Sequence, residues 1–176
     1  MNSLIFELNS ILKMIKKELK IVFTEYDSDS ELSLLEQDLL QKARDASDSA
    51  YAPYSNFFVG AALLLENGVI VSGNNQENVA YPSGLCAERV AIYAAGAQYP
   101  NVAIKVIAIT CKSKQFHVDE PLSPCGACRQ AMSEYEMRHH KNIRIILAGE
   151  TGKIRVMESI ADLLPFMFKA EALKRG

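Results

Sequence analysis

Three cysteines and one glutamate stand at spacings that could hold a catalytic metal ion. Glu88 follows two residues after Cys86, and two further cysteines stand three residues apart at Cys125 and Cys128. Three thiolates leave the fourth position of a zinc ion open for water, whereas a structural zinc site is normally closed by four protein ligands. Residues two apart on a helix do not share a face, so Glu88 is not expected to be a ligand beside Cys86. We expect it to reach the zinc-bound water and to transfer protons there.

Both cysteine segments are predicted to begin helices. Cys125 and Cys128 then project from one face of a first helical turn, and Cys86 stands at the start of a second helix. Helix N-termini carry partial positive charge and free N–H groups, which favour thiolate over thiol. Three thiolates also weaken the power of zinc to acidify bound water. Arg89 is therefore expected to donate to the sulfurs and to restore part of that power.

The cysteines also have other interpretations. A Cys-x-x-Cys pair alone could be a redox pair or half of a closed zinc site, and Cys86 could be a small core residue. Cys111 is a fourth possible ligand that would make the site structural. It ends an apolar strand run, however, where a free cysteine commonly packs as a buried hydrophobe. His117, His139 and His140 have no ligand-like spacing to the cysteines and are expected at the surface.

Size and composition are typical of one compact domain. The chain has 176 residues, of which 49% are hydrophobic and 23% charged, and its formal net charge is −2. A net charge this close to zero does not indicate binding to nucleic acid or to an anionic membrane. The basic cluster at 138–141 is expected to be a solvated helix end. Charged residues interrupt the apolar stretches of 1–23, so neither a signal sequence nor a spanning helix is predicted. The cysteines are therefore expected to be reduced thiols in the cytoplasm.

The chain divides into an N-terminal extension, residues 1–30, and one catalytic domain, residues 31–176. Within the extension, residues 19–23 are typical of a short strand or sheet edge, and Met14 is a second possible start of translation. Cap-type residues at 28–30 precede an amphipathic helix predicted over 31–50. Apolar residues at helical spacing also predict an earlier helix: Leu4, Leu8, Ile11, Leu12 and Ile15.

The rest of the chain alternates strand and helix patterns. Asn67-Gly68 is a hairpin signal between two apolar runs. The predicted strands are 58–65, 69–72, 105–111, 143–147 and 153–157. The predicted helices are 86–97 and 126–137, both apolar enough to be buried, and a C-terminal helix from Ser159. This order predicts an α/β fold of three layers, α-β-α, around a mixed, mostly five-stranded sheet.

Four longer segments resemble the small, homotetrameric, zinc-dependent cytidine deaminases. They are APYSNFFVGAA at 52–62, GNNQEN at 73–78, YPSGLCAER at 81–89 and SPCGACRQ at 123–130. The last two contain the Cys-x-Glu and Pro-Cys-x-x-Cys signature of zinc deaminases. The resemblance runs from about Leu39 to the C-terminus and leaves the N-terminal extension out.

The resemblance implies hydrolytic deamination of cytidine and deoxycytidine to uridine and deoxyuridine with release of ammonia, as in pyrimidine salvage. It implies one zinc ion per chain on Cys86, Cys125 and Cys128, with Glu88 as the general acid/base. The implied substrate positions are Phe57 and Val59 at the base, Asn75 and Glu77 at the ribose hydroxyls, and the backbone N–H of Ala87 at the pyrimidine carbonyl. In a homotetramer, Val79, Tyr81 and Phe168 would come from a neighbouring subunit.

The sequence departs from the family pattern at Asn74, Gln76 and Ser83, and Phe168 is followed by Lys169-Ala170 where Gly-Pro is frequent. A deaminase of another aminopyrimidine nucleoside or of a nucleoside antibiotic therefore stays open. A non-catalytic, zinc-stabilised scaffold is a further alternative, although it would have little use for Glu88. Individual assignments also have plainer readings, with Phe57 and Val59 as core residues and Glu77 as a solvated turn residue. A nucleic-acid editor would need a basic, aromatic-studded channel, which the sequence does not indicate.

Overall fold

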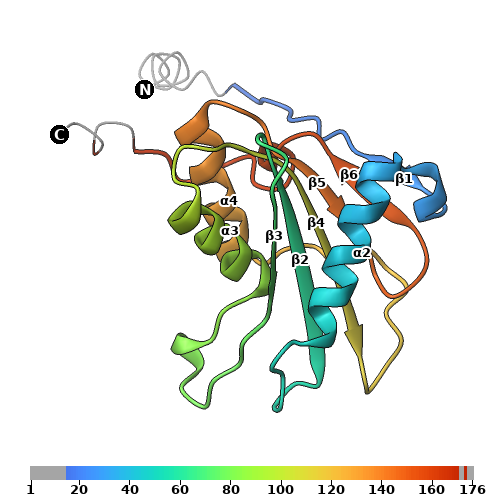
Figure 1. Ribbon diagram of the computed structural model, residues 1–176. Helices are drawn as coiled ribbons and strands as arrows, with labels where there is room; N and C mark the ends of the chain where they lie inside the picture. Colours follow the sequence, from blue (N-terminus) through green and yellow to red (C-terminus); the bar gives the residue numbers. More distant parts are fainter. Residues whose placement is uncertain (1–14, 171–172, 174–176) are drawn as a thin grey trace, which may run out of the picture.

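The structure, a computed structural model, describes residues 15–170 and 173 and is built around one six-stranded sheet (Figure 1). The strands follow the spatial order β1-β6-β5-β4-β2-β3, in which β4 and β5 are parallel and the other neighbours antiparallel. The strands are β1 (Thr24–Tyr26), β2 (Phe57–Leu65), β3 (Ile70–Asn74), β4 (Ile104–Ser113), β5 (Arg144–Leu147) and β6 (Ile154–Met157). The helices are α2 (Leu34–Asp48), α3 (Ala87–Gln98) and α4 (Gly126–His139), with 3₁₀ turns η1 (Asp29–Glu31), η2 (Tyr81–Ser83) and η3 (Ile160–Asp162).

Helices cover both faces of the sheet, which confirms the predicted three layers. Leu39, Leu40 and Ala43 of α2 pack against one face. On the other face, Ile92 of α3 and Met132 of α4 join a second buried cluster with side chains of β2, β4 and β5. Figure 1 shows α3 and α4 together on one side of the sheet and α2 on the other. The two helices that carry the cysteines therefore share one face of the sheet.

The hairpin between β2 and β3 forms where the sequence predicts it. Gly68 has a φ of +83° and donates its N–H to the carbonyl of Leu65 at 2.9 Å. A positive φ is readily adopted by glycine and disfavoured for other residues, which explains why Asn-Gly marks this turn. The predicted strands 58–65 and 69–72 agree with β2 and β3 to within two residues at each end.

The sixth strand, β1, comes from the predicted N-terminal extension. It pairs with β6, and Glu25 forms ion pairs with Lys153 at 2.6 Å and Arg155 at 3.1 Å. The strand predicted at 19–23 is thus placed a few residues too early, because Tyr26 is the side chain that packs against the α2-side core, while Leu19 stays exposed. The predicted earlier helix lies outside the described residues except for Ile15, which is not helical.

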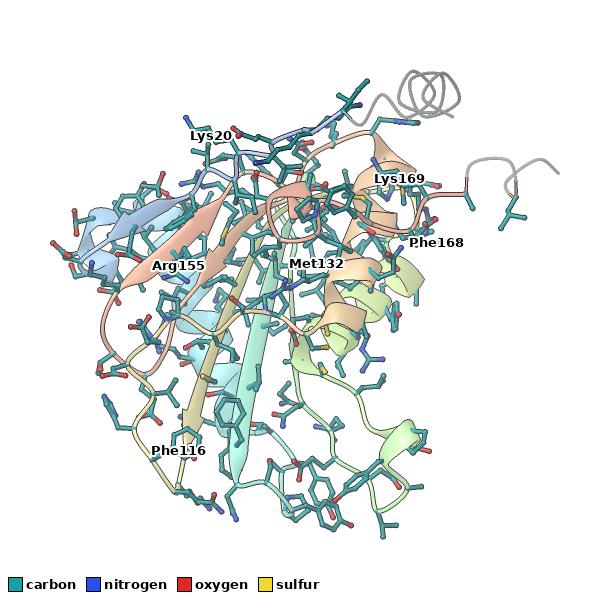
Figure 2. The ribbon with its side chains drawn as sticks, turned by 180° about the vertical axis from the view of Figure 1, so that it is seen from behind. Lys20, Phe116, Met132, Arg155, Phe168 and Lys169 are labelled. Carbon is teal, nitrogen blue, oxygen red and sulfur yellow. The ribbon has the colours of Figure 1, made fainter. Side chains whose placement is uncertain are left out.

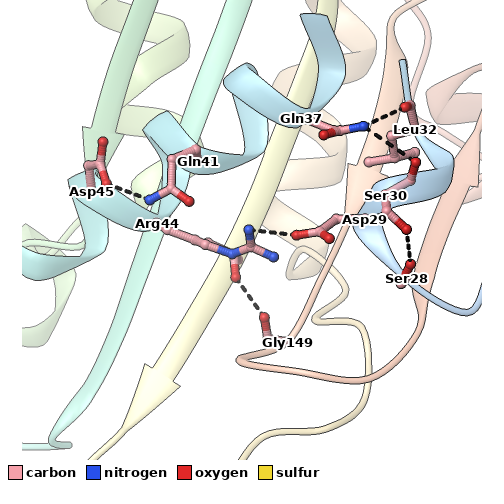
Figure 3. A network of polar contacts seen from close by, with 10 residues as sticks. Ser28, Asp29, Ser30, Leu32, Gln37, Gln41, Arg44, Asp45 and Gly149 are labelled. Carbon is pink, nitrogen blue, oxygen red and sulfur yellow. Dashed lines mark hydrogen bonds and ion pairs between the residues drawn. The ribbon is translucent and has the colours of Figure 1, made fainter. Parts of the chain in front are cut away.

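The predicted start of α2 needs correction. The cap-type residues at 28–30 form η1, and Ser33 is the residue that caps α2, with its hydroxyl accepting from the N–H of Glu36. The Glu36 carboxylate accepts the Ser33 N–H in return at 3.0 Å, which completes a capping box. Arg44 of α2 donates to Asp29 at 2.9 Å and so ties η1 to the helix (Figure 3).

The predicted C-terminal helix from Ser159 is wrong. Among the described residues from Ser159 onward, the only helical segment is η3, and the Ser159 hydroxyl accepts from the N–H of Ala161 at 3.1 Å. Pro165 lacks an N–H and disfavours helical backbone at Leu164, so the helix cannot continue. No helix among the described residues is long and apolar enough to cross a bilayer.

The predicted burial of α3 and α4 was also too high. Tyr93 of α3 is 47% exposed, and the fully buried residues of α4 are confined to Cys128, Met132 and Ser133. Each helix therefore buries one face against the sheet and leaves the other face open in the single chain. Apolar composition alone does not distinguish burial within a chain from burial against another chain.

Replacing Leu39 with alanine should destabilise the fold, because this side chain is fully buried between α2 and the sheet. We expect the free energy of unfolding to fall by about 2–5 kcal/mol, measured by urea denaturation. Leu34→Ala is the matched control, since Leu34 lies on the same helix and is 84% exposed. Its effect should stay within about 0.5 kcal/mol. Equal losses in the two variants would contradict the packing described for α2.

Candidate active site and metal centre

The three predicted zinc ligands meet where two helices begin. Cys86 is the N-cap residue of α3, Cys125 is the N-cap residue of α4, and Cys128 lies in the first turn of α4. Their sulfur atoms all lie within 4.8 Å of one another. The Sγ of Cys125 is 3.9 Å from that of Cys86 and 3.5 Å from that of Cys128. The sequence spacing thus corresponds to one cluster in space.

This cluster fits a zinc ion by its donor set and its dimensions. A tetrahedral zinc with Zn–S bonds of about 2.3 Å separates its sulfur ligands by about 3.8 Å, close to the distances between the cysteines. Among the described residues, no fourth histidine, cysteine or carboxylate belongs to the cluster. Cys111 is buried in β4 opposite Val59, apart from the other cysteines. Three sulfurs without a fourth protein ligand favour a catalytic zinc over a structural one.

Arg89 supplies positive charge to the sulfurs. Its Nη2 donates to the Sγ of Cys86 at 3.6 Å. A hydrogen bond from the Cys128 thiol and the charge of Arg89 together lower the pKa of Cys86 to about 5, although burial opposes this shift. The bond to Cys86 and burial raise the pKa of Cys128, so metal binding has to displace a proton there. The buried Nε of Arg89 has no hydrogen-bond partner among the described residues.

Glu88 is a buried carboxyl group beside the sulfur cluster. Its side chain is 3% exposed, and it lines the same cavity as Cys86 and Cys125. Burial raises its pKa above the ordinary value, and the negative charge of Cys86 acts in the same direction. A carboxyl group whose pKa is shifted toward neutrality can both accept and return a proton. This arrangement suits the acid/base role predicted from the sequence.

A cavity of about 630 Å³ opens in front of the cysteines, a size suited to a small ligand. Most of the residues singled out from the sequence line it: Phe57, Val59, Asn75, Glu77, Tyr81, Cys86, Glu88, Arg89 and Cys125. Ala87 is not a lining residue, but as the first residue of α3 it has a backbone N–H without an intrahelical partner. Val79 and Phe168 do not line this cavity and are 81% and 71% exposed.

Backbone contacts hold the side chain of Asn75 in the cavity wall. Its Oδ1 accepts from the N–H of Val59 at 2.8 Å, and its Nδ2 donates to the carbonyl of Phe57 at 2.9 Å. The amide thereby continues the pairing of β2 and β3 past the last residue of β3. One N–H and one lone pair of the amide remain for a ligand.

Glu77 is held by hydrogen bonds to the loop before β2. Its carboxylate accepts from the N–H of Tyr54 at 2.8 Å, and from the N–H and hydroxyl of Ser55 at 3.3 Å and 2.5 Å. Burial opposes ionisation, but these bonds prevail and keep the pKa of Glu77 below its usual value. Glu77 therefore presents a charged carboxylate at the rim of the cavity and anchors the loop before β2.

Sequence reasoning missed several residues around the site. Ser55, Leu122 and Ser123 line the cavity but received no role, although all three stand inside or beside the segments that resemble the deaminases. Arg129 donates to the carbonyl of Pro124 at 2.8 Å and to that of Leu163 at 2.9 Å, which ties the start of α4 to the C-terminal segment. Its position directly after Cys128 was the available signal.

The chain is similar in sequence to known cytidine deaminases. A sequence profile described as the cytidine and deoxycytidylate deaminase zinc-binding region matches residues 34–142. The cytidine deaminase of Halalkalibacterium halodurans is 39% identical over 137 residues, which cover 77% of this chain and 95% of that protein. The cytidine deaminase of Mycobacterium tuberculosis is 35% identical over 133 residues, covering 76% of this chain and 89% of that one.

Solved structures show the same fold. The crystal structure of cytidine deaminase from Burkholderia pseudomallei matches with a TM-score of 0.65 at 38% identity, and the match covers 74% of this chain and 97% of that one. The crystal structure of cytidine deaminase from Mycobacterium tuberculosis matches with a TM-score of 0.59 at 30% identity, covering 77% of this chain and 98% of that one. β1 and η1 precede the region matched by the profile.

Zinc analysis should find about one ion per chain, with three sulfur ligands at about 2.3 Å in metal-edge spectroscopy. Cys125→Ser should lose the ion, because it removes one of three converging thiols. Cys111→Ser is the matched control and should keep it, since Cys111 lies apart from the cluster in β4. A four-sulfur signal that disappears in Cys111→Ser would contradict the three-ligand site.

Proposed function

The chain belongs to the cytidine and deoxycytidylate deaminase family, and on this premise we propose that it hydrolyses cytidine and deoxycytidine to uridine and deoxyuridine, releasing ammonia. The observation that carries the proposal is the buried Glu88 beside three sulfurs that lack a fourth protein ligand, in one cavity. A structural zinc site needs neither an open position nor a buried acid next to it. A site that activates water needs both.

The proposed chemistry divides between the metal and the side chains. When bound, zinc supplies a water molecule of lowered pKa at the sulfur cluster. Glu88 would accept one proton of that water and pass it to N3 of the base as the hydroxyl group adds to C4. It would then accept the remaining proton of this hydroxyl group and pass it to the departing amino group, so that ammonia leaves. Burial of Glu88 at 3% exposure keeps bulk water from competing for these protons. Arg89 offsets part of the charge of the thiolates through its contact with Cys86.

The cavity wall offers partners for both halves of a nucleoside. Phe57 and Val59 supply an apolar surface on which a pyrimidine ring can stack or pack. Asn75 and Glu77 combine a donor, an acceptor and a charged carboxylate, which can bind the hydroxyl groups of a ribose. The free N–H of Ala87, at the start of α3, would bind the pyrimidine carbonyl.

A second candidate is a different aminopyrimidine nucleoside. Gln76, which replaces a β-branched residue usual in the family, lines the cavity and donates to Asn74 at 2.6 Å. Ammonia release from cytidine, deoxycytidine, cytosine and a cytosine-containing nucleoside antibiotic, assayed in parallel, separates the two candidates. If zinc-loaded protein releases ammonia from none of them, the proposed reaction is contradicted and the non-catalytic scaffold is favoured.

We further propose a cytoplasmic homotetramer in which residues 31–176 form the catalytic domain and neighbours complete each site. Val79 and Phe168 are at least 71% exposed and do not line the cavity of their own chain, so they can reach another chain. Tyr81 lines the cavity of its own chain but is 80% exposed, which also allows contact with a neighbour. The side-chain amide of Gln130 bonds both the N–H and the carbonyl of Phe168 at 3.1 Å, so the segment is held beside α4 with its ring outward (Figure 2). A reducing compartment would keep the cysteines free for zinc. The role proposed for the enzyme there is pyrimidine salvage.

Glu88→Gln should abolish most turnover while leaving zinc in place. The amide keeps the shape of the side chain but cannot accept a proton, and the carboxyl group is used in both halves of the reaction. We expect kcat for cytidine to fall by at least ~10³–10⁴-fold, near or beyond the upper end for acid/base groups. The zinc content per chain serves as the control. Near-normal kcat with full zinc would mean that another group carries the proton.

Mixing two inactive variants should restore activity if subunits share sites. Glu88→Gln removes the acid/base group, and Phe168→Ala removes the aromatic ring offered to a neighbour. After the subunits are exchanged, hybrids should contain sites with both an intact Glu88 and a neighbour's Phe168. Activity should exceed the sum of the two parents, while mixing either variant with itself gives no gain. A fully active monomer in sedimentation at assay concentration would rule this assembly out.

A further inference from the structure

A second aromatic ring lies against Phe57 at the cavity wall. The ring centroids of Phe116 and Phe57 are 6.1 Å apart, with 25° between the ring planes. Phe57 lines the cavity, whereas Phe116 does not and is 57% exposed. The pairing of Phe57 with Ser113, at the ends of β2 and β4, brings the loop after β4 to this position. Figure 2 shows Phe116 on that loop, beyond the end of β4.

The loop that carries Phe116 is bound to the segment 149–152. Both ring nitrogens of His117 are engaged, Nδ1 with Glu150 at 2.7 Å and Nε2 with the hydroxyl of Thr151 at 2.7 Å. The second carboxylate oxygen of Glu150 accepts the N–H of Ser113 at 2.7 Å, and the Val118 carbonyl accepts the N–H of Glu150 at 2.8 Å. The chain is therefore held on both sides of Phe116.

Two glycines allow the loops to approach so closely. A Cβ on Gly149 would lie 2.6 Å from the Val118 carbonyl oxygen, and one on Gly152 would lie 2.2 Å from that of Asp119. Gly152 also has a φ of +84°, a conformation that favours glycine. Backbone contacts of this kind leave no room for side chains, so the loop is docked by the backbone as well as by His117.

We propose that Phe116 is a positioning residue, which holds the ring of Phe57 in the orientation that receives the base of the substrate. Without Phe116, one face of the half-buried Phe57 ring would meet solvent and the ring could turn away from the cavity. Stacked aromatic pairs favour one relative orientation, and a docked loop supplies the second ring with little loss of conformational freedom. This inference rests on the proposed function, because it concerns how the same cavity binds its nucleoside.

Removing the ring should weaken nucleoside binding and leave the chemistry intact. We expect Phe116→Ala to raise KM for cytidine by ~2–10-fold, the range that the free energies of aromatic pairs imply. The value of kcat should stay within about twofold and zinc content should be unchanged, because Phe116 does not line the cavity that contains Cys86, Cys125 and Glu88. Phe116→Tyr should restore KM, since it returns an aromatic ring to the same place.

Phe23→Ala is the matched control for this substitution. Phe23 is also an exposed aromatic residue, and the Arg155 guanidinium lies 5.1 Å from its ring centroid. It precedes β1 at the opposite edge of the sheet from β3, so its loss should leave KM for cytidine unchanged. Equal increases of KM in both variants would overturn the positioning role.

Releasing the loop should act through the same ring. His117→Ala removes the contacts with Glu150 and Thr151 and should raise KM in the same direction as Phe116→Ala. In the double variant the two effects should not add, because both are exerted on Phe57. Full additivity would mean that the loop influences the cavity by another route and would overturn the proposal.

A direct probe of binding is available because the chain contains no tryptophan. Phe116→Trp introduces one indole against Phe57, and its emission should change when the product uridine is added in the absence of turnover. The positioning role alone would be overturned by the following combination of results. The parent turns over cytidine, KM is unchanged in Phe116→Ala, and the emission of Phe116→Trp does not change. Absence of cytidine turnover by the zinc-loaded parent would overturn the proposed function and this inference together.

Discussion

The site depends on two helix N-termini that converge on three sulfur atoms. A helix N-terminus leaves backbone N–H groups without partners and carries partial positive charge, so it stabilises a nearby anion. Cys86 and Cys125 occupy the two N-cap positions without making a side-chain cap bond, which leaves their sulfurs available to a metal. The parallel pairing of β4 with β5 requires a crossover, and α4 provides it on the same face as α3. The topology of the sheet therefore sets the geometry of the metal centre.

The polar groups of the cavity are held in place by the backbone before any substrate arrives. Asn75 is bound to both neighbours of Phe58 on β2, and Glu77 is bound to the loop at Tyr54 and Ser55. Side chains that are already ordered lose little freedom on binding, so more of their interaction energy appears as affinity. The same contacts join the loop before β2 to the chain after β3. These two segments therefore form one connected part of the cavity wall.

The parts of the site that depend on local spacing could be predicted from the sequence. Cys125 and Cys128 share a helical turn, and Cys86 with Glu88 starts another, so the pattern was enough to predict a metal centre with an acid beside it. The contact of His117 with Glu150 could not be predicted, because it joins residues far apart in the sequence that only the fold brings together. The prediction of a C-terminal helix was wrong because it relied on apolar residues and did not take account of Pro165, which disfavours a continuing helix.

The overestimated burial of α3 and the proposed assembly have one physical explanation. An apolar pattern records that a face is kept from water, but it does not record whether the cover comes from the same chain. Tyr93 of α3 and Phe168 of the C-terminal segment are exposed in the single chain, where burial of such residues would be favourable. Gln130 and Arg129 of α4 bind that segment within one turn of Cys128, one of the three predicted zinc ligands. The order of the metal centre is thus linked to the position of the aromatic ring that a neighbouring subunit would receive.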